Sequence, residues 1–248
     1  MTKKRVYDSF KTKATHEKSP NTLRDESQSD LKFDDLEIIK NYSELVNYYN
    51  DIALGYDELH FEEQKEKFSI IKKELESLGI NSKSIVLDVG CGTFFSFNYF
   101  NWNLFGVEPS SKMVDLFKKS QIIKNKEIES KKSMIKINKL NKLNVNKINE
   151  KEVFARIIVG FADCLSKYYS NEYFDSIICV SVAHHFKNSK RAFVEMKKVC
   201  KKDAVLGISL LKGTRNFNDV ELCLCSSFKI LNRIDSSKDV IFICKNID

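Results

Sequence analysis

Residues 84–93 read Ser-Ile-Val-Leu-Asp-Val-Gly-Cys-Gly-Thr, an apolar run that ends at an acid and two closely spaced glycines. A continuous run of Ile, Val and Leu is typical of a strand covered on both faces, as in parallel α/β sheets. Gly90 and Gly92 remove side chains where the backbone has to turn and approach a ligand. The next residues can begin a helix whose N–H groups face that ligand. We therefore expect a ligand site at the carboxyl end of this strand.

A second acid follows in the same register. Residues 103–108 predict the next strand, and Glu108 stands at its tip, twenty positions after Asp88, where a ribose-binding carboxylate belongs. Nicotinamide dinucleotides and S-adenosylmethionine share this layout. The dinucleotide fingerprint needs a third glycine where this chain has Phe95, and Asp88 would place a charge near the pyrophosphate. The pattern therefore disfavours a dinucleotide.

The later part of the chain predicts further strands with polar residues at their ends. Residues 155–159 predict a third strand that leads to Asp163, and residues 173–186 predict a fourth that carries a pair of histidines at its end. Residues 204–211 predict a fifth strand, and apolar residues within 228–244 predict a closing antiparallel pair about a turn-rich link. Ordinary dinucleotide-binding domains lack that hairpin.

Two motifs, Asp-x-Gly-Cys-Gly-Thr at 88–93 and Phe-Asp followed by His-His at 174–185, resemble those of the class I S-adenosylmethionine-dependent methyltransferases. The similarity is greatest to the small type-11-like domains and covers about residues 45–248. It implies a Rossmann-like three-layer α/β sandwich with a mostly parallel seven-stranded sheet and an antiparallel C-terminal hairpin. It also implies S-adenosyl-L-methionine as cofactor, no metal, and direct displacement at the methyl carbon.

The resemblance assigns cofactor contacts to single residues. It implies that Asp88 and the backbone of Gly90 and Gly92 position the methionine portion, and that Glu108 binds the ribose hydroxyls. The chain departs from the family at Phe94, which occupies the place of a third glycine. A side chain there has to point away from the cofactor, or it crowds the methionine end. Phe94 is also the main support for the alternative, a protein that binds cofactor or a partner without catalysis.

The resemblance further assigns the adenine to Asp163 with Cys164. For Asp163 the alternative is an aspartate that caps the next turn through its own backbone. Tyr49 and Tyr56 lie in a segment that many family members fold over the cofactor. Packing of a helix onto the sheet edge accounts for these two rings equally well.

His184 and His185 end the fourth predicted strand, so they should lie at the same edge of the sheet as the glycine turn. A histidine there can take a proton from an attacking nitrogen or oxygen, because its pKa lies near working pH. Alternatively, one or both side chains form hydrogen bonds with the backbone of the turn and shape the pocket, since methyl transfer often needs alignment more than a base. Both histidines remain candidates for the catalytic role.

Helical periodicity and composition divide the chain. Residues 1–35 predict a disordered tail and residues 36–248 a methyltransferase domain, with amphipathic helices at 36–49 and 62–78. Residues 118–151 form a Lys- and Asn-rich insertion without a sustained period, which predicts a surface loop or, alternatively, a substrate contact. The formal charge of +7, from 41 basic and 34 acidic residues, leaves RNA as a candidate partner beside a merely solvated surface.

Seven cysteines are scattered through the predicted elements, and we find no signal peptide and no apolar run that could span a membrane. We therefore expect reduced thiols in the cytoplasm and no membrane partner. Cys223 and Cys225 would lie on one face of a strand, and no second pair completes a metal site there. The oligomeric state and the methyl acceptor, either a small molecule or a tRNA base, cannot be inferred from the sequence.

Overall fold

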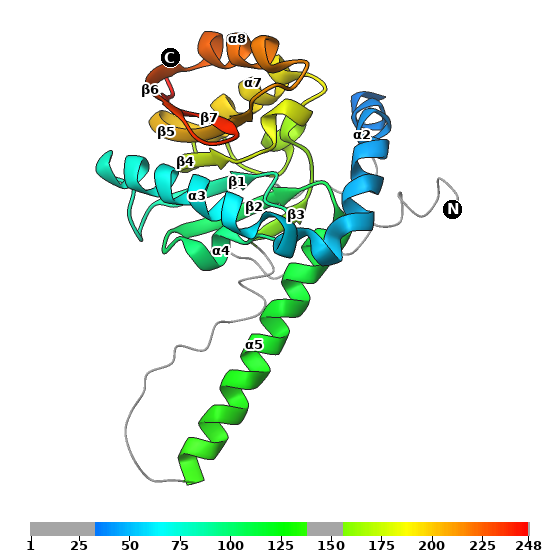
Figure 1. Cartoon of the computed structure of the whole chain (residues 1–248), viewed down its shortest axis with the longest axis vertical. Coiled ribbons are helices and arrows are strands. Elements are labelled where there is room, and N and C mark those ends of the chain that lie inside the picture. The colour runs from blue at the N-terminus through cyan, green and yellow to red at the C-terminus, as the bar shows by residue number, and fades with distance from the viewer. Residues whose placement is uncertain (1–32, 138–155, 248) are drawn as a thin grey trace.

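The computed structural model describes residues 33–137 and 156–247 and is built around one seven-stranded sheet (Figure 1). The strand order is β3-β2-β1-β4-β5-β7-β6. The first five strands are parallel, and β7 pairs antiparallel with both β5 and β6. The strands are β1 (Ile85–Val89), β2 (Asn103–Glu108), β3 (Ile157–Val159), β4 (Phe174–Cys179), β5 (Cys200–Leu211), β6 (Lys229–Asp235) and β7 (Asp239–Lys245). The expected fold class is confirmed.

Helices cover both faces of this sheet and produce two main cores. One core joins α3, α4 and α5 to one face, and the other joins η2, α7 and α8 to the opposite face. The helices are α2 (Phe33–Ile52), η1 (Ala53–Gly55), α3 (Tyr56–Ser77), α4 (Ser96–Tyr99), α5 (Ser111–Ile137), η2 (Ala162–Lys167), η3 (Ala183–His185), α7 (Ser189–Val199) and α8 (Phe217–Ser227). The continuous apolar strands are therefore buried on both sides, as their composition predicts.

The register of the parallel strands brings their carboxyl ends together. Asp88 in β1 lies opposite Gly106 in β2, and Glu108 at the tip of β2 lies opposite Val159 in β3. The turn after β1, the tip of β2 and the segment after β3 therefore meet at one edge of the sheet. This is the edge at which ligands bind in open α/β folds.

Phe94 lies in the turn after β1 with its side chain in the core. Its φ of 57° is in the left-handed region, which costs a non-glycine residue about 1–2 kcal/mol. The ring is fully buried and packs at 5.0 Å from the ring of Phe117, and burial of such a ring contributes about 1.5–3 kcal/mol. Gly106 makes room for it, because a Cβ there would lie 3.1 Å from the Phe94 ring. The hydrophobic gain thus offsets the backbone strain, and the ring points away from the sheet edge.

The structure differs from the sequence-based expectation in the Lys- and Asn-rich insertion. Helix α5 continues through residues 118–137 and extends away from the rest of the fold (Figure 1). The stretch contains neither Gly nor Pro and is rich in Lys, a good helix former, so helix propensity sustains the helix without an amphipathic period. Residues 138–151 of the predicted loop lie outside the described residues.

Other element boundaries also differ. Helix α2 begins at Phe33, so the three residues 33–35 of the predicted tail are helical, and residues 1–32 lie outside the described part. Helix α3 begins at Tyr56, six residues before the predicted helix. Cys223 and Cys225 lie in α8 and not in a strand, because Val220 and Leu224 recur at a helical spacing and are both buried. Within residues 33–137 and 156–247, no helix has both the length and the apolar character needed to cross a membrane.

Candidate functional site

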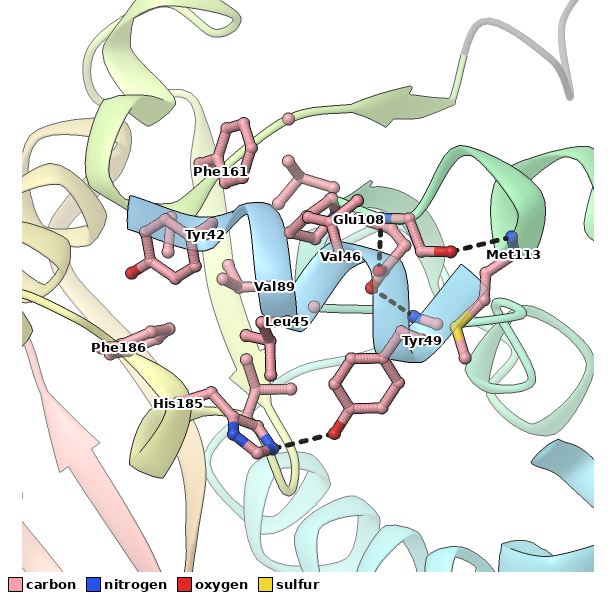
Figure 2. A pocket seen from close by; sticks show the side chains of 18 of the residues that line it. Tyr42, Leu45, Val46, Tyr49, Val89, Glu108, Met113, Phe161, His185 and Phe186 are labelled. Carbon is pink, nitrogen blue, oxygen red and sulfur yellow. Dashed lines mark hydrogen bonds between the residues drawn. The ribbon is translucent and has the colours of Figure 1, made fainter. Parts of the chain in front are cut away.

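A cavity lies at the carboxyl ends of β1, β2 and β4, beneath α2 (Figure 2). It contains about 670 Å³ of empty space, part of it open to solvent. Six of the residues predicted for the site line it: Tyr49, Tyr56, Gly90, Gly92, Glu108 and His185. Residues that lie up to 136 positions apart in the sequence, such as Tyr49 and His185, therefore share one site.

Glu108 is fixed in this cavity by the backbone around it. Its Oε2 accepts a hydrogen bond from the N–H of Gly92 at 3.0 Å, and its Oε1 accepts from the N–H of Ser110 at 2.8 Å. Burial raises the pKa of Glu108 to about 7, although both N–H groups favour the charged form. Each carboxylate oxygen keeps a further lone pair. The side chain is therefore oriented to accept hydrogen bonds from two neighbouring hydroxyls.

The glycine turn is crowded on one side and open on the other. Gly90 has a φ of 73°, and a Cβ there would lie 2.5 Å from Cγ2 of Val182. Gly92 has a φ of 57°, and its nearest neighbours for a Cβ are Met113 Sδ at 3.6 Å and Tyr56 at 3.8 Å. Gly90 is therefore required by packing against the turn after β4, as well as by its backbone conformation. Phe94 lines neither this cavity nor the adjoining one, so it meets the condition that its ring point away.

Asp88 does not line the main cavity. It lines a smaller adjoining cavity of about 470 Å³, and its Oδ2 accepts a short hydrogen bond from Ser96 Oγ. Burial, and to a lesser extent the charge of Glu108, raises the pKa of Asp88 to about 7 despite this bond. The two cavities share Tyr56, Gly90 and Gly92. The glycine turn therefore lies between Asp88 and the main cavity.

Asp163 lies at the opposite end of the main cavity, next to Phe161 and Ala162 in its wall, but does not itself line it. Its Oδ2 accepts from the hydroxyl of Tyr42 at 3.1 Å, whereas its Oδ1 is buried without a hydrogen-bond partner among the described residues. Burial raises the pKa of Asp163 to about 6. Unsatisfied buried carboxylate oxygens are costly, so Oδ1 is suited to accept from a ligand amino group.

Cys164, the other residue assigned to the adenine, is buried in an apolar cluster with Ile38, Tyr42 and Phe161. Its Sγ contacts the hydroxyl of Tyr168 at 3.3 Å and does not line the cavity. The structure therefore brings Cys164 close to the site without exposing it there.

Tyr49 and His185 meet across the cavity. The Tyr49 hydroxyl and His185 Nε2 are 2.8 Å apart (Figure 2). Burial, with the nearby charge of Glu108, raises the pKa of Tyr49 to about 12, and burial lowers the pKa of His185 to about 4. Both groups are therefore neutral at pH 7. Tyr56 lines both cavities, and its ring centroid lies 6.0 Å from that of Tyr49.

His184 packs against His185, with ring centroids 4.0 Å apart and ring planes tilted by 45°. It does not line the main cavity, and its Nδ1 is buried without a hydrogen-bond partner among the described residues. Burial, and then the charge of Lys67, lowers the pKa of His184 to about 4. Only His185 of the pair therefore faces the cavity.

Sequence reasoning missed the residues that attach α2 to the cavity. The Tyr42 hydroxyl donates to Asp163 and accepts from the backbone N–H of Lys187 at 2.9 Å. The Asn50 side chain accepts from Ser110 Oγ at 2.8 Å. In the sequence, Tyr42 is one member of a helical apolar period, and this pattern does not reveal that its hydroxyl has two partners.

Residues 87–208 match the family model described as a methyltransferase domain. No sequence among curated proteins matches the chain. The match and the fold identify a class I methyltransferase domain, of the S-adenosylmethionine-dependent type.

Solved structures show the same fold at low sequence identity. A chain of the complex between the Haloferax volcanii Trm112 methyltransferase activator and the putative methyltransferase has a TM-score of 0.53 and 9% identity, over 81% of this chain and 98% of that one. The PH0226 protein from Pyrococcus horikoshii OT3 has a TM-score of 0.51 and 17% identity, over 75% and 91%. The N-methyltransferase NodS from Bradyrhizobium japonicum WM9 has a TM-score of 0.51 and 12% identity, over 75% and 97%.

The residues present fit the cofactor that this type of domain uses. Glu108 offers two oriented oxygens for a ribose diol, and Asp163 offers a buried oxygen without a partner for an amino group. The apolar wall at Phe161 and Ala162 suits a flat base. Among the described residues, no cluster of His, Cys, Asp and Glu is arranged to hold a metal ion.

Proposed function

We propose that this protein is an S-adenosylmethionine-dependent methyltransferase. The observation that carries the proposal is Glu108, a buried carboxylate that lines the main cavity and is held by two backbone N–H groups. Hydrogen bonds from ribose hydroxyls to such a carboxylate are charge-assisted and cost no rearrangement of the side chain. The cofactor supplies a methyl group on a positively charged sulfur.

The other residues of the site would hold the rest of the cofactor. Asp163 Oδ1 accepts from the adenine amino group, and Phe161 packs against the base. Gly90 and Gly92 leave space for the chain that leads from the ribose toward Asp88. In this arrangement the glycine turn aligns the methyl group with the acceptor, and alignment is the main contribution of the protein.

The histidines act mainly through position in this proposal. A pKa of about 4 keeps the His185 ring neutral, so it can accept a hydrogen bond but is a weak base at pH 7. With Tyr49 it forms a polar pair in the cavity wall, and this pair can orient the accepting nitrogen or oxygen. His184 supports His185 from behind. A modified tRNA base and a small metabolite both fit a neutral, partly aromatic wall of this kind.

The alternative is a cofactor-binding or partner-binding protein without catalysis. Its main support in the sequence was Phe94, because a ring at that place threatened the methionine end. The ring is buried and lines neither cavity, which removes this argument. Catalysis is therefore the function that the site supports better.

Two measurements test the proposal. Native mass spectrometry and calorimetry on the purified chain should detect binding of S-adenosylmethionine or S-adenosylhomocysteine. Incubation with methyl-labelled cofactor and separate RNA, protein and small-molecule fractions should then transfer label to one of them. A chain that binds neither molecule refutes the proposed function, and one that binds both but labels no fraction supports the alternative.

A further inference from the structure

Ser181 directly precedes the histidine turn after β4 and lines the main cavity. Its Oγ accepts a hydrogen bond from Lys67 Nζ at 2.7 Å and another from Gln64 Nε2 at 3.4 Å. A hydroxyl has two lone pairs and one proton, and here both lone pairs face donors. Among the described residues the proton has no acceptor. Ser181 is therefore a hydrogen-bond donor toward whatever occupies the cavity.

The ammonium of Lys67, which donates to Ser181, is itself buried among polar groups. Lys67 is 1% exposed, and its ammonium contacts Glu63 Oε1 at 2.6 Å, Asp239 Oδ1 at 3.0 Å and the Ser181 hydroxyl. Two of its N–H groups donate to Glu63 and Ser181, and the Asp239 contact is an ion pair without hydrogen-bond geometry. Because the ammonium is buried among these groups, it does not reach a ligand directly. Asp239 also accepts from Ser209 Oγ at 2.7 Å, and Ser209 Oγ accepts from the backbone N–H of Ser181 at 2.8 Å. The network therefore fixes Ser181 by both its side chain and its backbone.

The charges of this network do not oppose an anion at the hydroxyl. Lys238 pairs with Glu63 at 2.8 Å, so two lysines balance two carboxylates and an arriving anion meets no net repulsion from them. A buried ammonium 2.7 Å from Oγ polarises the O–H bond and strengthens it as a donor. Ser181 also has a φ of 61°, and strained conformations of non-glycine residues concentrate at ligand sites.

Ser181 lies where the two cavities meet. Its partner Gln64 lines the smaller cavity, and the glycine turn lines both. If Glu108 and Asp163 bind the nucleoside end of the cofactor, the amino-acid end extends toward this junction. Asp88 lines the smaller cavity as well and would attract an ammonium group. An amino acid would thus find a hydrogen-bond donor and an acid within the adjoining walls.

We propose that Ser181 is a carboxylate-binding residue, whose hydroxyl is aimed and polarised by the buried ammonium of Lys67. The favoured source of the carboxylate is the amino-acid portion of the cofactor, so the inference rests on the proposed function. A carboxylate on the methyl acceptor offers the same chemistry. In both cases Lys67 is a positioning residue, because it acts through Ser181 and does not touch the ligand.

The test compares two nucleosides that differ in the amino-acid portion. S-adenosylhomocysteine carries the carboxylate, and 5′-methylthioadenosine lacks it. By calorimetry, Ser181→Ala should weaken binding of S-adenosylhomocysteine about tenfold or more and leave binding of methylthioadenosine unchanged. Ser181→Gly should give the same loss with an unchanged or higher Tm, because glycine suits a φ of 61°. Ser176→Ala, which removes a buried hydroxyl from β4 outside both cavities, should change neither affinity.

A second arm distinguishes the source. Benzoate is titrated into protein saturated with S-adenosylhomocysteine. If Ser181→Ala weakens benzoate binding but leaves the ratio of the two nucleoside affinities unchanged, the carboxylate bound by Ser181 belongs to the acceptor and the proposal stands. If Ser181→Ala weakens the binding of both nucleosides equally, or changes neither nucleoside binding nor benzoate binding, Ser181 has only a structural role and the proposal is overturned. Failure of the wild-type protein to bind either nucleoside would instead refute the proposed function.

Discussion

Two buried carboxylates lie at the main cavity, Glu108 in its lining and Asp163 behind the wall formed by Phe161 and Ala162, and they are held in different ways. Glu108 receives both of its hydrogen bonds from backbone N–H groups in turns that follow β1 and β2. Asp163 receives one from Tyr42 of helix α2, and its other oxygen has no partner among the described residues. The Glu108 end is thus built by the sheet, whereas the Asp163 end depends on a helix that packs across it. We expect the first to be rigid and the second to respond to changes in α2.

The largest effect should come from the sheet-built end. Gly90→Val would place a branched side chain 2.5 Å from Val182 and force it to a φ of 73°, so binding of S-adenosylhomocysteine should be undetectable by calorimetry and the Tm should fall. Gly213→Val is the matched control, since Gly213 has a φ of 74° with nothing within 4 Å. Retained binding in Gly90→Val would show that the ligand lies elsewhere.

Removal of the carboxylate itself should have the next largest effect. Glu108→Ala should weaken cofactor binding by about 1–3 kcal/mol, because charge-assisted bonds to the ribose are lost. Glu108→Gln, which keeps the shape and one acceptor, should lose less. Calorimetry on the folded variants measures both, and an unchanged dissociation constant in Glu108→Ala would contradict the assignment of this residue to the ribose.

The two ends should also differ in their response to pH. A pKa of about 7 means that the Glu108 side chain in the free protein is mostly protonated at pH 6 and mostly ionised at pH 8. The ionised form accepts hydroxyl protons better, so binding of S-adenosylhomocysteine should tighten by up to about tenfold from pH 6 to pH 8. Glu108→Gln should flatten this dependence. A profile that stays steep in Glu108→Gln would assign it to Asp88, whose pKa is also about 7.

The smallest of these effects is expected at the helix-built end. Tyr42→Phe removes one hydrogen bond to Asp163 and the acceptor for the Lys187 N–H, which should weaken cofactor binding about two- to tenfold. Tyr48→Phe is a suitable control, because Tyr48 is an exposed residue of the same helix. A loss in Tyr42→Phe larger than in Glu108→Ala would reverse the comparison, and α2 would then be the main determinant of the site.

The sheet-built end could be predicted from the sequence because its signals are local. The apolar run, the glycines and the acid at position 108 are short motifs whose meaning depends on neighbouring residues. The helix-built end required contacts over 121 residues, from Tyr42 to Asp163, and no periodicity encodes such a hydroxyl contact. For the same reason, the sequence did not reveal the burial of Lys67. A lysine in an amphipathic helix predicts solvent exposure, whereas Lys67 is paired inside the protein. Helix α5 was underestimated because helix propensity sustains it beyond residue 118, where the apolar residues show no helical period in the sequence.

Phe94 and Gly106 constrain each other across two strands of the chain. The turn lacks its usual third glycine, and a glycine in β2 supplies the missing space, since a Cβ at residue 106 would lie 2.7 Å from Cys91 Sγ and 3.1 Å from the Phe94 ring. In this lineage the two positions should therefore have changed as a pair. We expect covariation of positions 94 and 106 among close relatives, with larger residues at 106 confined to chains that carry a small residue at 94 and at 91. A family pattern that requires glycine at position 94 would overlook such chains, although a glycine at position 106 keeps the space that the turn needs.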